Sequence, residues 1–389
     1  MIIENPEAAQ ITSFFLELQN IKGLDLRDNR GKRHALNIVL LGLLIALLRN
    51  RDGNLSSIHR AMENTHPRLM KELKDLYGID YQEVVSRSHL PILLQKVNID
   101  VFSELLFKYF GLSLNEEEKR WFAVDGKELR GTIEAGSTRG EAIVQVVRHG
   151  DRAVLSQGYY NGRKESEQPV VQELLKKNGL ASQGVTFDAL HFNPRTLNYI
   201  EYKGGHYIGG LKGNQEEILV DMKAFITVQN ADFQLLESEK GHGREESRQY
   251  YCKSIEGEYL DKRWRFSGLA TVIMVKRSRL INSYQKYSED TNYYMTNLKV
   301  VNQDNADRSF QAIRGHWGVE VNNHIRDVTF KEDKLITKLK FVARPITLCR
   351  TLILSLLQKE KIENYAQKMD SFTDDFEQVL TFLKNVKVL

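Results

Sequence analysis

The chain has 389 residues, of which 41% are apolar and 27% charged, and it contains only 6 prolines. This composition is that of a folded globular protein rather than a disordered one, and the length predicts two or three domains. The longest apolar stretch, residues 35–48, is shorter than the roughly 20 residues that a membrane-spanning helix needs. It therefore predicts a buried core helix.

The charge and the cysteines narrow the class of protein further. The net charge is +4, and residues 1–120 hold 16 basic and 16 acidic side chains, so the whole excess lies in the rest of the chain. Any phosphate binding would come from local basic clusters, such as those in 27–33 and 331–344. Cys252 and Cys349 form no metal-like pair, which argues against zinc and disulfides. The N-terminus lacks the basic segment of a secretory signal, so we expect a cytoplasmic protein.

Residues 9–112 are predicted to be helical, because apolar side chains recur at every third or fourth position and strand alternation is absent. A polar connector follows at 112–120. These observations predict an all-helical N-terminal domain over residues 1–115. Several short helices of this kind are compatible with a DNA-binding role, and DNA-end binding is the expectation for this domain.

The pattern changes to β-type runs at residue 121. Three such runs, at 121–129, 142–150 and 152–160, predict an antiparallel meander. The elements predicted next are a helix at 165–178, a strand at 184–190, a helix at 194–202, a strand at 206–211 and a helix at about 214–227. This order predicts a mixed α/β sheet with helices packed on it over residues 116–230.

Residues 231–300 contain further short β-type runs around a Gly-rich stretch at 240–244, and they predict a β-rich insertion. Helical spacing returns at Ser309, where Ile313, Trp317 and Glu320 fall on one side of a predicted helix. Residues 301–389 are thus predicted to carry one more core helix and a helical tail.

Three acids are the candidate catalytic and metal-binding residues. Asp125 and Asp188 end or interrupt buried β-type runs, and Glu320 lies on the predicted helix. Acids at the ends of neighbouring strands and on a crossing helix can converge, and convergent acids stay ionised together only when cations hold them. An all-oxygen site with open positions favours Mg²⁺ or Mn²⁺. Two such ions roughly 4 Å apart catalyse in-line displacement at phosphorus.

Each acid also has a simpler interpretation. An aspartate at a strand end is often a turn former or a helix cap, which applies to Asp125 before Gly126 and to Asp188 ahead of the helix near Pro194. A lone helical glutamate such as Glu320 is usually a solvated surface residue. The functional interpretation depends on the three acids acting together.

Other residues are predicted to support the site or bind DNA. His316 and His324 lie one helical turn before and after Glu320, and Asp327 lies near the same face. A lone helical histidine is more often packed and hydrogen-bonded than a ligand. Further supporting residues are His191, after the second aspartate, and four cations suited to phosphate or to solvated strand edges, Lys127, Arg130, Lys212 and Arg244.

Five ordered segments resemble a known family. They are AVDGKELRG, TFDALHFN, YIGGLKGNQ, GHGREESR and IRGHWGVEVNNHIRDVTFKED. In order, they resemble the successive motifs of the DDE transposases of the H-repeat-associated (ISAs-type) group of bacterial insertion sequences. The helical segment that begins DLRDNRGKRHALNIVLLGLLIAL is similar to the N-terminal domain of that group. The matches cover about residues 25 to 345.

The resemblance implies a ribonuclease-H-like catalytic core with a β-rich insertion, and a catalytic triad of Asp125, Asp188 and Glu320 that binds two Mg²⁺ ions. It also implies that the protein acts on double-stranded DNA as a homodimer, in association with the nucleoid. The chain departs from the family pattern after the glutamate. Val321 and Ile325 replace an asparagine and a tryptophan, and Asp327 follows His324 by three residues instead of four.

The function predicted from the sequence is therefore metal-dependent DNA cleavage at the ends of an insertion sequence, followed by strand transfer into target DNA. One alternative is a stand-alone DNA nuclease or resolvase on the same core. A second is a domesticated DNA-binding protein that no longer cuts.

Overall fold

The computed structural model describes residues 13–50, 52–109, 120–241, 243–255, 260–281, 286–337 and 339–389. The chain divides into two compact units. The helical unit comprises Met1–Leu112, Leu129–Gly140 and His324–Leu389, and the sheet unit comprises Ser113–Glu128 and Glu141–Asn323. The domain boundary predicted near residue 115 lies outside the described residues.

The helical unit is built around α2. Its helices are α1 (Phe14–Asn20), α2 (Leu36–Arg49), α3 (Leu55–Tyr77), α4 (His89–Leu94), α5 (Ile99–Tyr109), α11 (Ala343–Lys359), α12 (Tyr365–Asp374) and α13 (Phe376–Asn385). The side chains of residues 38–48 are all buried, because α3, α11 and α12 pack around α2. The predicted buried core helix is thus confirmed. Within the described ranges, no helix is long and apolar enough to cross a membrane.

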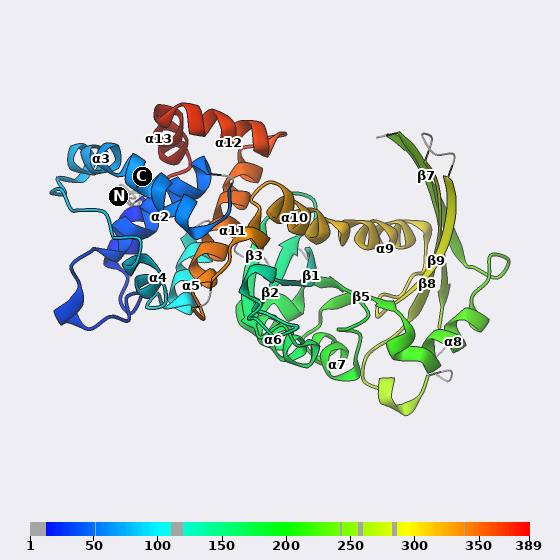
Figure 1. Ribbon diagram of the computed structural model, residues 1–389. Helices are drawn as coiled ribbons and strands as arrows, with labels where there is room; N and C mark the ends of the chain where they lie inside the picture. The colour runs from blue at the N-terminus through cyan, green and yellow to red at the C-terminus, as the bar shows by residue number, and fades with distance from the viewer. Residues whose placement is uncertain are drawn as a thin grey trace, which may run out of the picture. The chain divides into compact units, whose positions relative to one another are not determined.

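The sheet unit contains one mixed nine-stranded sheet (Figure 1). Its strands are β1 (Trp121–Glu128), β2 (Ala142–Arg148), β3 (Val154–Tyr160), β4 (Gly184–Phe187), β5 (His206–Leu211), β6 (Phe233–Gly241), β7 (Arg244–Ser254), β8 (Thr271–Ile281) and β9 (Lys286–Thr296). The strand order is β3-β2-β1-β4-β5-β9-β8-β7-β6. β1, β2 and β3 form the predicted antiparallel meander, and β1, β4 and β5 run parallel.

The strands of residues 231–300 continue this sheet instead of forming a sheet of their own. β9 pairs antiparallel with β5, from Ile208 opposite Thr296 to Leu211 opposite Tyr293. β8, β7 and β6 then follow in antiparallel order. The β-type runs therefore predict the strands correctly.

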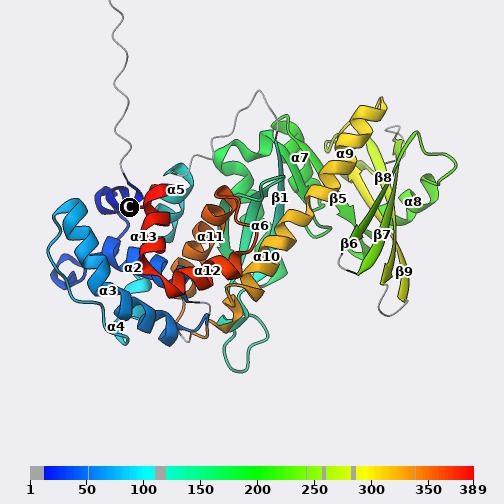
Figure 2. The same ribbon diagram turned by 90° about the horizontal axis from the view of Figure 1, so that it is seen from above.

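Helices cover both faces of the sheet (Figures 1 and 2). They are α6 (Lys164–Lys176), α7 (Pro194–Tyr202), α8 (Glu216–Phe225), α9 (Gln303–Gly315) and α10 (Trp317–Val328). α6 packs on β2 and β3, whereas α9 contacts β1, β5 and β6. The single helix predicted from Ser309 onwards is wrong, because α9 ends at Gly315 and α10 starts at Trp317, whose side chain is 47% exposed.

Candidate functional site

The register between β1 and β4 brings two of the three predicted acids together. The strands are parallel, and their last aligned pair is Val124 with Phe187. Asp125 and Asp188 are the residues that follow this pair along the two strands, so they lie side by side. Side chains at equivalent positions of parallel strands point to the same face. The sheet thus places these two carboxylates next to each other.

Asp125 and Asp188 differ in their local roles. Asp125 is inside β1, which continues to Glu128, so the interpretation of Asp125 as a turn former is wrong. Asp188 does stabilise a turn, because its Oδ1 accepts a hydrogen bond from the Leu190 N–H at 2.9 Å. It does not cap α7, since Asn193 holds that position and accepts from the Thr196 N–H at 3.1 Å. One oxygen of Asp188 therefore has a structural partner.

Helix α10 supplies the third acid. Asp188 and Glu320 both line a pocket of about 140 Å³ between the strands and the α9–α10 junction. Lys212, which follows β5, and His316, which lies between the two helices, line the same pocket. Lys212 is exposed, so its ammonium group is accessible beside the acids.

Asn323 links α10 directly to β1. Its Nδ2 donates a hydrogen bond to Asp125 Oδ2 at 3.2 Å. Residues three apart on a helix share one face, so Glu320 and Asn323 approach the strand acids together. This contact connects Asp125 with the helix that carries Glu320.

The three acids are electrostatically coupled. Burial raises the pKa of Asp125 to about 7, the neighbouring Asp188 adds to this, and Glu167 and Glu320 contribute further, against the lowering effect of the Gly126 N–H. Burial also raises the pKa of Glu320, which Lys212 and Arg277 counteract. Acids that repel one another in this way favour a bound cation.

His316 is part of a neutral hydrogen-bonded chain. The Thr186 hydroxyl lies 3.1 Å from His316 Nδ1 and 3.0 Å from His149 Nε2. Burial lowers the pKa of His316 to about 4 and that of His149 to about 3, so both rings are uncharged at neutral pH. His316 therefore helps to hold the α9–α10 junction in place. It supplies no positive charge for binding a phosphate.

Glu167 is a fourth acid, which the sequence patterns did not indicate. It is buried on α6, where its Oε2 accepts from the Tyr160 hydroxyl at 2.7 Å and its Oε1 lies 3.0 Å from His191 Nε2. A Cβ at Gly126 would lie 2.5 Å from Glu167 Oε1. The only signal in the sequence is a glycine in the middle of a buried strand, which often marks a close approach.

The remaining predicted residues are distributed more widely. Lys127 is buried in the sheet unit, and Arg244 is exposed at the start of β7. Arg130, by contrast, belongs to the helical unit, where its Nε lies 3.9 Å from Asp333 Oδ2. The division between the units falls after Asn323, so His324 and Asp327 are also assigned to the helical unit.

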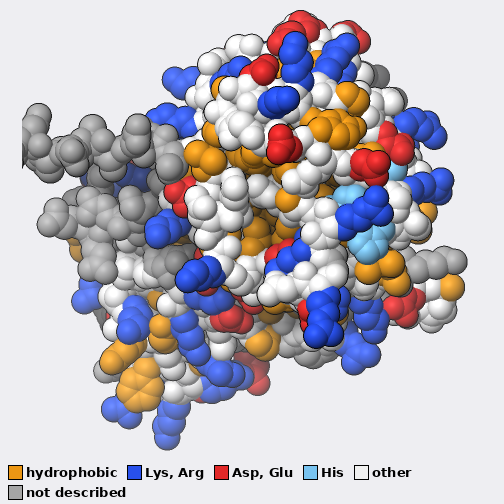
Figure 3. Space-filling model, turned by 90° about the vertical axis from the view of Figure 1, so that its left-hand side faces the viewer, with side chains coloured by type: hydrophobic (Ala, Val, Ile, Leu, Met, Phe, Trp, Pro, Cys, Tyr) orange, Lys and Arg blue, Asp and Glu red, His pale blue; other side chains and the backbone are white. Residues whose placement is uncertain are grey.

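The predicted basic clusters are partly balanced by acids. In the cluster at 27–33, the Arg27 Nε and Nη2 donate to Asp25 at 2.9 and 2.8 Å, and Arg33 lies 3.3 Å from Glu83. On the face drawn in Figure 3, Lys and Arg side chains are interspersed with Asp and Glu. Lys338 of the second cluster lies outside the described residues. The positive charge of the 27–33 cluster is therefore partly neutralised by neighbouring acids.

The acids provide the oxygen ligands that Mg²⁺ prefers. Their mutual effect on the pKa of Asp125 fits a site that binds positive charge. Among the residues that the structure describes, however, no group of three or more His, Cys, Asp or Glu side chains is close enough to share an ion. The oxygen atoms of these acids are thus of the type that binds a divalent cation. The acids do not, however, form a closed coordination shell.

Comparisons with known proteins give relatives over most of the chain. No family model matches it. It is 24% identical over 348 residues to the H repeat-associated putative transposase YhhI of Escherichia coli K12, which covers 87% of this chain and 89% of the relative. It is 22% identical over 347 residues to the Putative transposase YncI of Escherichia coli O157:H7, covering 86% and 85%.

The Putative protein YbfL of Escherichia coli K12 is also 24% identical, over 308 residues, or 77% of this chain and 79% of the relative. Among solved structures, a piggyBac transposase synaptic complex with hairpin DNA aligns with 96% of this chain and 77% of its own, at 11% identity and a TM-score of 0.44. A likeness this weak does not define the fold.

Proposed function

We propose that this chain is a transposase that cleaves DNA at the ends of an insertion sequence and joins the freed ends to target DNA. The observation that carries the proposal is the gathering of Asp125, Asp188 and Glu320, from three distant segments, into one electrostatically coupled group. The relatives that carry transposase names over most of the chain support it. A ribonuclease-H-like core is part of the proposal, because adjacent parallel strands supply the two aspartates.

In this proposal Asp125, Asp188 and Glu320 would supply oxygen ligands for two Mg²⁺ or Mn²⁺ ions. When bound, such ions stabilise the charge that develops on the attacking and leaving oxygens at phosphorus. Asn323 orients Asp125 through its hydrogen bond, and Thr186 and His316 hold the start of α10 in place. Lys212 offers an exposed cation at the pocket for a DNA phosphate.

The test is a cleavage assay on cloned element ends with Mg²⁺. We expect Asp188→Asn and Glu320→Gln to lower the cleavage rate by at least about 100-fold, because each removes a charge that acts in the transition state. Duplex binding should stay near native strength. Asp221→Asn, an exposed acid on α8, is the matched control and should cleave normally. Near-native cleavage by either site variant would overturn the assignment.

A second assay separates the proposed transposase from a nuclease or resolvase on the same core. A precut element end with a free 3′-OH should be joined to a target duplex by the native chain. Cleavage without joining would favour the nuclease. Binding without either reaction, in the presence of Mg²⁺, would favour a DNA-binding protein that no longer cuts.

A further inference from the structure

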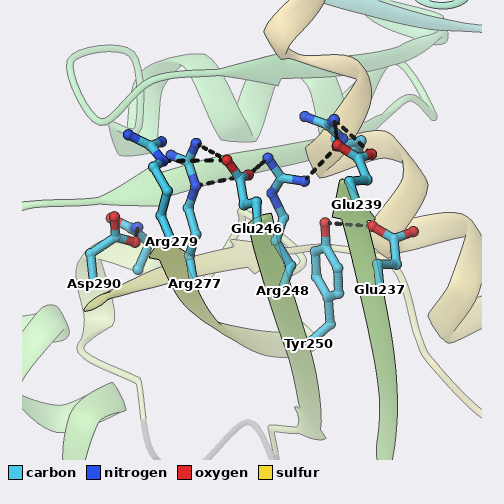
Figure 4. Close-up of polar contacts among 10 residues, drawn as sticks. Glu237, Glu239, Glu246, Arg248, Tyr250, Arg277, Arg279 and Asp290 are labelled. Carbon is cyan, nitrogen blue, oxygen red and sulfur yellow. Dashed lines mark hydrogen bonds and ion pairs between the residues drawn. The ribbon is translucent and has the colours of Figure 1, made fainter. Parts of the chain in front are cut away.

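One face of the β6–β9 strands changes character along its length. Near α9 it is apolar, and Tyr250, Ile273 and Val275 pack against Phe310 in a buried cluster. Further along the same strands the face becomes charged, because Arg248 lies opposite Arg277 and Glu246 lies opposite Arg279. Residues two apart on a strand share a face, so these side chains gather on one surface. Figure 4 shows them reaching toward one another.

A buried glutamate organises these arginines. Glu246 is only 4% exposed, and its carboxylate accepts hydrogen bonds from Arg277 Nε at 3.0 Å and Nη2 at 2.9 Å. Arg279 Nε donates to the same carboxylate at 3.3 Å, and Arg248 also contacts it (Figure 4). Three guanidinium groups thus contact this one carboxylate, and charge-assisted hydrogen bonds of this kind hold them in place.

The acids nearby are also engaged, and one of them pairs with Arg248. Glu239 Oε2 lies 3.7 Å from Arg248 Nη1. Both oxygens of Glu239 are 2.9 Å from Arg314 Nη2, which comes from α9. Glu237 accepts from the Tyr250 hydroxyl at 3.2 Å, and Asp290 accepts from Asn292 Nδ2 at 2.9 Å. Arg248 therefore has two acidic partners, whereas among the described residues Arg277 and Arg279 form ion pairs with Glu246 alone.

Arg277 and Arg279 keep donors that a ligand can reach. Their side chains are 23% and 31% exposed. Within the described part of the chain, Arg279 makes one hydrogen bond, from its Nε, so its two Nη groups point to no protein acceptor. Burial lowers the pKa of Arg279, the adjacent charges of Arg277 and Arg244 add to this effect, and Asp290 opposes it. An anion placed here would relieve that repulsion.

This surface adjoins the candidate site. Arg277 lies opposite Asp290 of β9, which is two residues before Asn292 on the same strand face. Asn292 and Tyr294 of β9 line the same pocket as Asp188 and Glu320. Duplex DNA carries one negative charge per roughly 1.7 Å of its axis, so a duplex with one phosphate at the acids presents several more to the adjoining surface.

We infer that Arg277 and Arg279, held in place by Glu246, form a phosphate clamp that binds the DNA backbone beside the reacting phosphate. The inference rests on the proposed function, because it assigns the cluster to the same DNA substrate. Two adjacent guanidinium groups on a rigid sheet suit a phosphate better than single flexible lysines, since each presents a planar fork of donors. Glu246 is a positioning residue in this arrangement.

The test measures duplex affinity of the whole chain over a salt series, without divalent cations so that no cleavage occurs. Removing one cation that binds a phosphate should reduce the slope of log affinity against log salt by about 1. We expect this for Arg277→Gln and for Arg279→Gln, and Arg279→Lys should retain most of the slope because the charge stays. Lys276→Gln is the matched control, because this cation is on the same strand and the opposite face.

Native slopes in both glutamine variants, with native thermal stability, would overturn the inference while the proposed function stands. Reduced slopes in a chain that neither cleaves nor joins DNA with Mg²⁺ would support the clamp and count against the proposed function. A slope that falls equally in the Lys276 variant would mean that the effect is diffuse charge, and it would also overturn the clamp.

Discussion

Asn323 donates its amide Nδ2 hydrogen bond to the Asp125 carboxylate at 3.2 Å, which joins helix α10 to strand β1. The bond connects two segments almost two hundred residues apart in the sequence. It fixes one point of α10 against β1, on the helix face that also carries Glu320.

Asn323→Ala should lower the rate of DNA cleavage by about 10- to 100-fold, the range typical for partners that orient catalytic ligands. Duplex affinity should be unchanged, because Asn323 faces an acid. The measurement compares single-turnover cleavage with duplex binding. Gln311→Ala, at an exposed position of α9, is the control. Equal cleavage rates for the two variants would show that Asp125 is oriented without Asn323.

Gly126→Ala should destabilise the sheet unit, because the added Cβ would lie 2.5 Å from Glu167 Oε1 and 2.8 Å from the Tyr160 hydroxyl. Glu167 cannot easily move away, since Tyr160 and His191 both hold it. We expect a loss of about 1–3 kcal/mol in the free energy of unfolding by urea. Gly213→Ala, where nothing lies within 4 Å of the added Cβ, should be neutral. A neutral Gly126→Ala would mean that the Glu167 contact is adaptable.

The raised pKa of Asp125 predicts a pH dependence of stability. Because this pKa is about 7 in the folded chain, against 3.8 ordinarily, the folded state binds more protons between these values. The free energy of unfolding therefore falls as pH rises from about 4 to about 7. Asp125→Asn should remove that loss and be more stable than the native chain by roughly 1–3 kcal/mol at pH 8 without divalent cations.

The measurement is urea unfolding of the native chain and of the Asp125→Asn variant at pH 4.5 and pH 8. The difference in their free energies of unfolding should nearly vanish at pH 4.5. Mg²⁺ at pH 8 should stabilise the native chain and not the Asp125→Asn variant, because a cation that binds only the folded state shifts the unfolding equilibrium. A difference that is the same at both pH values would contradict the assignment of the raised pKa to Asp125.

In the helical unit, Glu332 should be essential for stability. It accepts from Arg326 Nε at 2.7 Å and Nη2 at 2.8 Å, and both side chains are almost fully buried. Arg350 Nη1 lies 3.7 Å from the same carboxylate. Glu332→Gln leaves two buried guanidinium groups without their counter-ion, so we expect a loss of about 3–5 kcal/mol. Glu363→Gln, at an exposed position, should unfold like the native chain.

Local patterns were sufficient to predict much of the fold. The predicted helix at 194–202 has the bounds of α7, because Asn193 is a good N-cap and Pro194 suits the first turn. The β-type runs and the turn-like residues between them are enough to predict the meander of β1, β2 and β3. The pairing of β5 with β9 could not be predicted, since Gly209 and Met295 meet across a long sequence separation that no local pattern encodes.

A site residue could be predicted only where a side chain suited to catalysis stands at the end of a strand or at helical spacing from another candidate. Asp188 satisfied that condition, whereas Glu167 lies in an ordinary amphipathic helix and acquires its role only through contacts with Tyr160 and Gly126. Arg130 follows Asp125 closely in sequence but belongs to the other compact unit. The sequence pattern also does not predict the break between α9 and α10 at His316, because the apolar spacing continues across it.

The pairing of β9 with β5 has a practical consequence for protein engineering. Removing residues 231–300 would strip β5 of the hydrogen-bonded neighbour on one side and leave a bare strand edge at the pocket. Such edges recruit other chains and promote aggregation. Residues 231–300 are therefore an integral part of the sheet, and a shortened chain would need a replacement strand to cover this edge.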